Sequence, residues 1–282
     1  MKIAIRYCAE FHYDDSVSLS PHVVRLFPRR DVYLEVDSMK FTAEGASDIS
    51  HRADLFGNTV AVCFFPKTQR RLRIGLDLDL RVQERNPFHF LLAPHAVTMP
   101  FTYLPEEAEV LAPFLAPSGG DFKLPGEFKC PAGASTVDVL AAWNAVAREL
   151  IAYERREHGD PHTPAETLRR GKGSCRDIAV LFAAVLRCHG IATRLVSGFL
   201  WERPDDDSER VAENSLHAWV EACLPGAGWV GMDPTNGVFA DHHRIAAAVG
   251  LHPHQIAPVE GRYFSNSPVK SHLDATLNIL EQ

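Results

Sequence analysis

The sequence predicts an α+β protein with a β-rich leading part and a second part in which helices precede strands. Residues Arg71–Val82 alternate apolar and polar side chains, as in an antiparallel strand with one buried face. Residues 116–133 are rich in proline and glycine, which is typical of a loop between domains. Beyond this loop, apolar residues recur at the three- and four-residue spacing of helices.

Two domains are expected, because 282 residues exceed what one hydrophobic core usually holds. We assign residues 1–120 to a β-sandwich or small barrel, 121–133 to a linker and 134–282 to the second domain. The strands expected in the first domain are Lys2–Tyr7, Asp31–Asp37, Thr59–Phe65 and Arg71–Val82.

The second domain begins with two capped helical segments and continues into strands. Gly198 lies inside a predicted strand, where a glycine often marks a bulge or a close backbone approach. The acidic tract Pro204–Arg210 is expected to be a solvated loop. The other expected elements are helices at Thr136–Glu157, after Thr163 and from Cys175 to Gly190, and strands at Ala192–Trp201 and Leu273–Leu280.

Cys175 stands at the predicted start of its helix, behind the flexible approach of Gly171 and Gly173. The unpaired amides and the positive end of the helix dipole favour a thiolate there. A cysteine in a helix is more often a small buried side chain, and we interpret Cys188 in that way. For Cys175, the choice depends on whether a base and an orienting carboxylate follow.

Both groups follow at the ends of two neighbouring predicted strands. His217 lies in the alternating run LHAWVEACLPG, and Asp233 ends the next run, GWVGMDPTNG, where Pro234 prevents the strand from continuing. A hairpin turn near Pro225 joins the two runs. The pattern therefore predicts a Cys-His-Asp triad, with His217 as the base and Asp233 fixing the imidazole tautomer.

These motifs carry a family resemblance that extends over nearly the whole chain. The segments GSCRD and LHAWVEACLPGAGWVGMDPTNG resemble the transglutaminase-like superfamily, and more narrowly the bacterial transglutaminase-like cysteine peptidases. The resemblance includes Tyr153, TPAETL and APVEGRY, and it reaches the N-terminus through SVSLSPHVVRLFP and DLFGNTV. It implies a papain-like catalytic domain behind a β-rich leading domain, with Cys175 as nucleophile, His217 as base and Asp233 as orienter.

The implied activity is that of a thiol hydrolase, a peptidase or amidase that works through an acyl-enzyme. The backbone N–H of Cys175 is one expected oxyanion donor, and the second donor is left open. Acyl transfer to an amine, as in a true transglutaminase, is the close alternative, because it needs the same three residues. A non-catalytic interaction module is the second alternative, since some members of the superfamily have lost the triad.

We also assign five residues to the substrate cleft. Gly173, Ser174 and Trp219 neighbour the triad residues in the sequence, and His252 and His254 lie in a loop that departs from the family. The family usually has an acidic and aromatic segment there, so these histidines are expected to affect substrate choice.

Composition narrows the possible partners. A net charge of −7 and the lack of a basic run argue against nucleic acid, and no apolar stretch is long enough to span a bilayer. The six cysteines have no paired metal-ligand spacing, and no signal peptide is recognised, so we expect reduced thiols and a cytoplasmic location. Asp241-His242-His243 lacks a second ligand pair, so neither a metal nor a cofactor is expected. The expected partner is a peptide or amide substrate, and the oligomeric state is left open.

Overall fold

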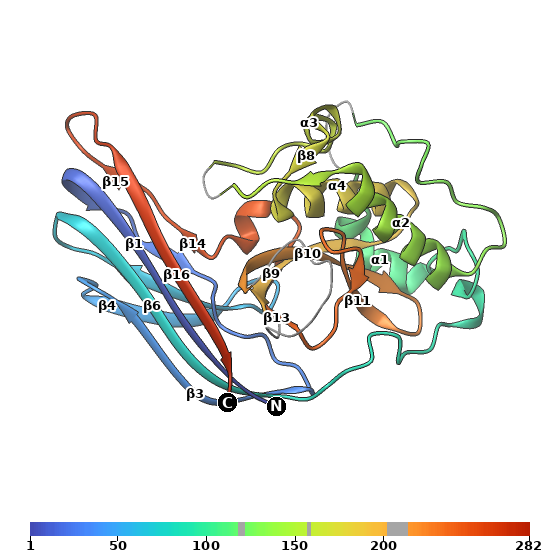
Figure 1. Cartoon of the computed structure of the whole chain (residues 1–282), viewed down its shortest axis with the longest axis horizontal. Coiled ribbons are helices and arrows are strands. Elements are labelled where there is room, and N and C mark those ends of the chain that lie inside the picture. The colour runs from blue at the N-terminus through green and yellow to red at the C-terminus, as the bar shows by residue number, and fades with distance from the viewer. Residues whose placement is uncertain (118–121, 157–158, 202–213) are drawn as a thin grey trace.

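The computed structural model describes residues 1–117, 122–156, 159–201 and 214–282. The acidic tract Pro204–Arg210, expected to be a loop, lies outside these described residues. In Figure 1 the β-rich part stands on one side of the molecule and the helices on the other, with a second sheet between them.

The leading part consists of two antiparallel sheets packed face to face, which confirms the predicted β-rich domain. In the larger sheet the strand order is β15-β1-β6-β3, with β16 also paired to β1, and in the smaller sheet it is β14-β2-β5-β4. The apolar positions of the Arg71–Val82 pattern all point into the core between the sheets. The strands are β1 (Lys2–Leu19), β2 (His22–Val24), β3 (Leu34–Ala43), β4 (Asp48–Ala53), β5 (Thr59–Phe64) and β6 (Gln69–Val82).

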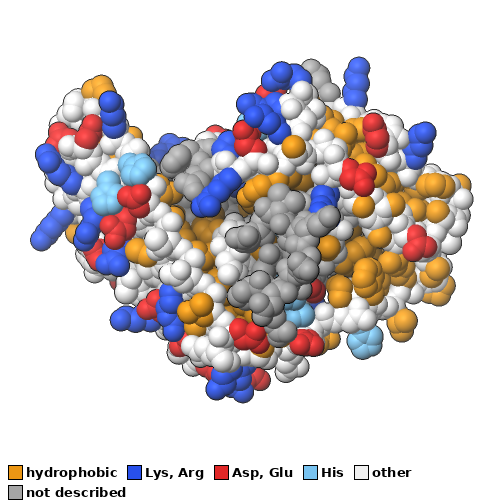
Figure 2. Space-filling view, in the orientation of Figure 1, with side chains coloured by type: hydrophobic (Ala, Val, Ile, Leu, Met, Phe, Trp, Pro, Cys, Tyr) orange, Lys and Arg blue, Asp and Glu red, His pale blue; other side chains and the backbone are white. Residues whose placement is uncertain are grey.

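The outer face of the larger sheet is covered by cross-strand ion pairs. Arg6 pairs with Asp79 at 2.6 Å, and Arg73 pairs with Glu44 at 3.0 Å. In Figure 2 charged side chains are crowded on this part of the molecule, whereas hydrophobic ones gather over the helical part. Exposed pairs of this kind contribute little to stability, so burial of the inner face holds this part together.

The C-terminal strand belongs to the sheet of the N-terminus. Strand β16 (Ser271–Glu281) runs antiparallel to β1, from Ile3 opposite Glu281 to Tyr13 opposite Ser271. The short strands β14 (Val259–Glu260) and β15 (Tyr263–Phe264) pair with β2 and β1. The predicted alternation at Leu273–Leu280 is therefore confirmed as a strand, but it does not extend the 134–282 unit to which we assigned it. Alternation shows that one face is buried and does not name the neighbouring strand.

Residues 94–115, predicted within the β-rich region, contain helices. The 3-10 helix η1 (Pro94–Ala96) and helix α1 (Pro105–Leu115) each begin with a proline, which suits the first helical position. Ala96, Met99 and Phe101 pack into the core of the second part, away from the leading sheets. The division at 121–133 stays a prediction, although these contacts show that residues before 121 already belong to the second core.

The second part is a five-stranded sheet with helices on one face. The strand order is β12-β11-β10-β9-β13, and all pairings are antiparallel. Helix α4 contributes Ile178, Leu181, Phe182 and Val185 to the core against the sheet. The elements are α2 (Thr136–Leu150), β7 (Ala152–Tyr153), α3 (Pro164–Arg170), β8 (Lys172–Gly173), α4 (Cys175–Cys188), β9 (Thr193–Leu200), β10 (Ser215–Leu224), β11 (Gly228–Asp233), β12 (Val238–Phe239), β13 (Arg244–Gly250) and the 3-10 helix η2 (Pro253–Ile256).

Two expectations about the helices need correction. Helix α2 ends at Leu150 rather than Glu157, because the chain turns into the short strand β7, which pairs with β8. Cys188, interpreted as buried, is exposed, because it lies beyond Leu186, where the apolar face of α4 ends. None of the described helices is both long and apolar enough to cross a membrane.

Gly198 confirms the predicted close backbone approach. A Cβ atom on this residue would lie 2.0 Å from the carbonyl oxygen of Ile245, a distance that no side chain tolerates. The register between β9 and β13 also shifts between Ala246 and Ala248, as at a bulge. From the same sheet, Phe199, Trp201 and Ile245 pack into the core of the leading part. The middle sheet therefore joins the two halves of the molecule.

Candidate active site

Ser174 and Asp177 fix the start of helix α4. The carboxylate oxygen Oδ2 of Asp177 accepts hydrogen bonds from the Ser174 backbone N–H at 2.7 Å and from its hydroxyl at 2.8 Å. A Cβ atom on Gly173 would lie 2.8 Å from Cβ of Asp177, so only glycine fits there. These contacts hold Cys175 in the first helical turn, whose amides the helix itself leaves unused.

Asp177 also ties a second segment of chain to the helix start. Its Oδ1 atom accepts from Arg156 Nη2 at 2.6 Å and from the His162 backbone N–H at 2.7 Å, and its side chain is fully buried. Burial opposes ionisation, but the N–H groups of His162 and Ser174 and the Arg156 charge hold the pKa of the Asp177 carboxyl below its usual value. Gly173 and Ser174, assigned to the cleft, therefore have structural roles at the helix start.

His217 and Asp233 meet across the paired strands β10 and β11. The pairing of Val220 with Met232 sets the register, which brings the start of β10 beside the end of β11. Nε2 of His217 lies 3.0 Å from Oδ2 of Asp233, and both side chains have 0% exposure. The predicted proximity of these two residues is therefore present in the structure.

The Asp233 carboxylate accepts five hydrogen bonds. Oδ2 accepts from His217, from Asn236 Nδ2 at 2.9 Å and from Arg244 Nε at 2.9 Å. Oδ1 accepts from the backbone N–H groups of Thr235 at 3.1 Å and Asn236 at 3.3 Å. Burial opposes ionisation, but the charges and hydrogen bonds of His217, Arg244 and Asn236 hold the pKa of the Asp233 carboxyl well below its usual range. Asp233 is therefore a fixed anion beside the imidazole.

The thiol of Cys175 lies within reach of the imidazole of His217. Burial opposes formation of the thiolate, but a hydrogen bond with His217, the charge of that ring and the backbone N–H of Ala218 lower the pKa of Cys175. Burial opposes protonation of His217 in turn, but Asp233 and Cys175 raise the pKa of His217. The two shifts favour a thiolate beside an imidazolium.

The ring nitrogens of His217 have different surroundings. Nε2 is held by Asp233, whereas Nδ1 is buried and has no hydrogen-bond partner other than Cys175 within the part of the chain that the structure describes. Since Nε2 is committed to the carboxylate, Nδ1 is the nitrogen left to exchange a proton with Cys175. The three predicted residues are thus brought together in the order Cys175, His217, Asp233.

Several groups at this site were not singled out from the sequence. Asn236 and Arg244 bind the Asp233 carboxylate, and Asp177 fixes the helix start. Tyr153, which the sequence did indicate through the family resemblance, is half-buried, and both burial and the nearby charge of Cys175 raise the pKa of its phenol. The DPTN sequence after β11 was a usable signal for Asn236, because asparagine often bonds across a turn. Arg244 gave no signal, since it begins an otherwise apolar strand.

The remaining cleft assignments are one buried residue, Trp219, and two exposed ones, His252 and His254. Trp219 is buried and packs with Val196 and Ala240. The centroid of its ring lies 6.2 Å from that of the His217 ring. His252 and His254 are exposed and stack on each other with ring centroids 5.7 Å apart. Their role in substrate choice stays a prediction.

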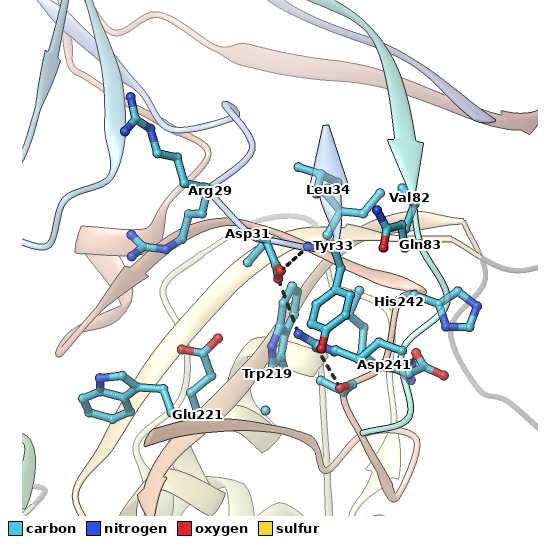
Figure 3. Close-up of a pocket in the computed structure, with 18 of the residues that line it drawn as sticks. Arg29, Asp31, Tyr33, Leu34, Val82, Gln83, Trp219, Glu221, Asp241 and His242 are labelled. Atoms are coloured by element: carbon cyan, nitrogen blue, oxygen red, sulfur yellow. Dashed lines mark hydrogen bonds and ion pairs between the residues drawn. The ribbon is translucent and has the colours of Figure 1, made fainter. Parts of the chain in front are cut away.

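A cavity of about 210 Å³ lies between the leading part and the sheet face that carries Trp219. Ala218 and Val220 face the helices, so the alternating Trp219 and Glu221 point to this opposite side. Figure 3 shows Trp219 and Glu221 on one wall and Tyr33 and Leu34 of the leading part on the other. Neither Cys175 nor His217 lines the cavity, so it is separate from the thiol.

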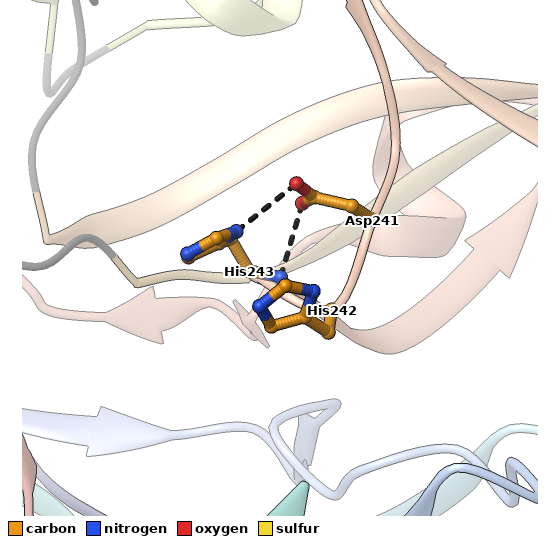
Figure 4. Close-up of side chains that lie close together, drawn as sticks. All are labelled: Asp241, His242 and His243. Carbon is orange, nitrogen blue, oxygen red and sulfur yellow. Dashed lines mark hydrogen bonds and ion pairs between the residues drawn. The ribbon is translucent and has the colours of Figure 1, made fainter. Parts of the chain in front are cut away.

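Asp241, His242 and His243 cluster as a metal site would, with ligand atoms within 4.8 Å of one another (Figure 4). Both carboxylate oxygens of Asp241 are already engaged, one by His243 Nδ1 at 3.0 Å and the other by Arg244 Nη1 at 3.0 Å. The adjacent guanidinium charge also opposes a cation. The donor set therefore suits a buried ion-pair network better than a metal.

Comparisons with known proteins match both halves of the chain. Residues 131–234 match the transglutaminase-like superfamily, and residues 3–81 match the bacterial transglutaminase-like N-terminal region. The crystal structure of a candidate cysteine protease from Cytophaga hutchinsonii superposes with a TM-score of 0.71 at 16% identity, covering 100% of this chain and 91% of that one. At this identity the likeness shows the fold alone.

Two mycobacterial relatives match part of the sequence. An uncharacterized protein of Mycobacterium leprae is 34% identical over 127 residues, which are 45% of this chain and 44% of the relative. One of Mycobacterium tuberculosis is 31% identical over 120 residues, which are 41% of this chain and 38% of the relative. The match thus spans less than half the length of these relatives.

The fold is papain-like and transglutaminase-like, with helix α4, which carries Cys175 in its first turn, packed against an antiparallel sheet. Residues 131–234 form a transglutaminase-like core. Residues 3–81 correspond to the N-terminal region of the bacterial transglutaminase-like proteins.

Proposed function

We propose that the protein is a thiol hydrolase, a peptidase or amidase, that uses Cys175, His217 and Asp233 as a catalytic triad. The observation that supports it most is the buried contact of His217 with Asp233 on one side, while His217 lowers the pKa of Cys175 on the other. A merely structural cysteine gains nothing from such neighbours. Perturbed pKa values that arise from specific partners are typical of catalytic groups.

The reaction proceeds in two halves. The Cys175 thiolate attacks the carbonyl carbon of an amide, and the electron pair of the C=O π bond moves to the oxygen. The backbone N–H of Cys175, which has no acceptor within the helix, donates a hydrogen bond to this oxyanion. The C–N bond then breaks, His217 gives its proton to the leaving amine, and a thioester remains on the sulfur. Water attacks the thioester while His217 takes its proton, which releases a carboxylic acid and restores the pair. Asp233 keeps the imidazole oriented throughout.

The substrate is proposed to be a peptide or another amide. The superfamily and the fold of the Cytophaga hutchinsonii protein support this class. Acyl transfer would follow if an amine, rather than water, reached the thioester, since all preceding steps are shared. The cytoplasmic location stays a prediction from the cysteine pattern.

The test is mass spectrometry of a peptide library after incubation with the protein, with and without a primary amine. Cleaved or deamidated peptides that are absent with Cys175→Ala would support hydrolysis. Amine adducts on glutamine in place of these products would replace hydrolysis by acyl transfer. Equal product spectra for the wild-type protein and the Cys175→Ala variant would contradict any thiol-based activity.

A further inference from the structure

Arg244 is a buried cation held between two carboxylates. Its side chain is 0% exposed, its Nε lies 2.9 Å from Oδ2 of Asp233, and its Nη1 lies 3.0 Å from Oδ1 of Asp241. An unpaired charge in a protein interior costs several kcal/mol, so the two carboxylates are what make this position possible. Two ion pairs at different nitrogens also fix the plane of the guanidinium.

Arg244 and His217 donate to the same oxygen atom. His217 Nε2 lies 3.0 Å and Arg244 Nε 2.9 Å from Oδ2 of Asp233. Because a carboxylate oxygen has few acceptor directions, the arginine limits where the imidazole can bind. Its positive charge acts on the Asp233 carboxylate, and that carboxylate is the group that raises the pKa of His217, the partner of the Cys175 thiol.

We propose that Arg244 is a positioning residue of this site, which orients Asp233 toward His217 and sets the pH range in which Cys175 is a thiolate. The effect on the pH range of the thiolate rests on the proposed function, because it is measured at the Cys175–His217 pair. Neither the sequence motifs nor the relatives assign Arg244 such a role.

Among the described residues, the charged and titratable groups around the pair come from α4, β7, β10, β11 and, with Arg244, β13. His217 on β10 faces Asp233 on β11 and Cys175 on α4. The charge of Arg176 also lowers the pKa of Cys175. The charge of Cys175 in turn raises the pKa of Tyr153 on β7. On the far side of Arg244, Asp241 also accepts a hydrogen bond from His243.

Removing the charge of Arg244 and removing the charge of its second partner, Asp241, should move the pH at which Cys175 ionises in opposite directions. Without the guanidinium, the thiolate loses a nearby cation, so ionisation of Cys175 moves to higher pH. With Asp241 neutralised, the Arg244 charge is less compensated, so ionisation of Cys175 moves to lower pH. If Arg244 had a purely structural role, the two substitutions would change the free energy of unfolding. The pH at which Cys175 ionises would then be the same in both variants as in the wild type.

The experiment measures the rate of Cys175 alkylation by iodoacetamide between pH 4 and 9 in the full-length protein, with Cys175 resolved by mass spectrometry. We expect the midpoint to rise by about 0.5–1 pH unit in Arg244→Gln and to fall by a smaller amount in Asp241→Asn. Arg194→Gln is the matched control, because Arg194 is a partly buried arginine of the same sheet that pairs with Glu221 at 2.6 Å instead. Its midpoint should equal that of the wild type.

The outcomes separate the two proposals. A wild-type midpoint like that of an ordinary cysteine would contradict the proposed function. A lowered wild-type midpoint that folded Arg244→Gln and Asp241→Asn both leave unchanged would overturn the role of Arg244. If Arg244→Gln does not fold, Asp241→Asn decides alone, since only the proposed role predicts its downward shift.

Discussion

His217 Nε2 and Asp233 Oδ2 lie 3.0 Å apart between two side chains that solvent does not reach. This contact does more than hold two residues together. It commits one ring nitrogen to a carboxylate and leaves the other for the thiol, so the tautomer of His217 is fixed by the fold. Arg244 and Asn236 hold the carboxylate from its remaining directions.

Asp233→Asn should lower turnover by roughly 10²–10⁴, because an amide can hold the imidazole in the wrong tautomer. It should also lower the free energy of unfolding by about 3 kcal/mol, because the buried Arg244 charge loses one partner. Turnover is measured on whichever peptide the library yields, and unfolding by urea titration.

Glu221→Gln is the matched control for this prediction. Glu221 sits on the neighbouring strand β10, four residues from His217, and it also pairs with an arginine, Arg194. Its turnover should stay within a factor of about two of the wild type, whereas its stability changes modestly. Equal losses of turnover in the two variants would mean that the Asp233 effect is a general loss of fold.

Asp177→Ala should destabilise the protein and slow alkylation of Cys175 together. The buried carboxylate caps helix α4 and pairs with Arg156, so its removal should cost about 2–3 kcal/mol. The loosened first turn should also hold the thiolate less well. Asp138→Ala is the control, because Asp138 occupies the same position in the first turn of α2, far from the thiol. Unchanged alkylation in a destabilised Asp177→Ala would show that the cap serves stability alone.

The same carboxylate predicts an acid limit to stability. The pKa of Asp177 is lower in the folded state than the ordinary value of about 4, so its contribution is complete above pH 4 and is lost as the pH falls through the folded value. Thermal unfolding between pH 2 and 6 should therefore show a smaller dependence on pH in Asp177→Asn than in the wild type. Parallel curves would contradict a stabilising ionised Asp177.

The surface pair His252 and His254 offers a test of substrate choice. If these two exposed imidazoles border the cleft, they should favour peptides with a carboxylate near the scissile amide, because imidazole N–H groups donate hydrogen bonds to carboxylates. Replacing both by alanine should reduce this preference, measured as kcat/KM on acidic and neutral peptides. An unchanged preference would place the loop outside substrate recognition.

The local patterns predicted the elements well because they depend on neighbours in the sequence. Alternation identified Arg71–Val82, and helical spacing behind a glycine approach identified the Cys175 helix. The end of α2 was missed because β7 forms only by pairing with β8, which is a tertiary contact. The partner of β16 was equally hidden, since alternation does not say which strand lies alongside.

The site followed a similar division. Cys175, His217 and Asp233 were visible because their residue types and strand-end positions fit a known chemistry. Arg244 was not, because a single arginine before an apolar run is usually exposed, and only the fold places it between Asp233 and Asp241. Gly173 and Ser174 both serve the helix start, and their assignment to the substrate cleft stays a prediction.

The most direct test of the triad is the order in which the six cysteines react with iodoacetamide at pH 6, mapped by mass spectrometry on the folded protein. His217 lowers the pKa of Cys175, whereas burial raises the pKa of Cys63, Cys130 and Cys223. We expect Cys175 to be alkylated first, ahead even of the exposed Cys188, and to lose this lead in His217→Ala. Alkylation of Cys188 or Cys8 while Cys175 remains unmodified would contradict an activated thiol at this site.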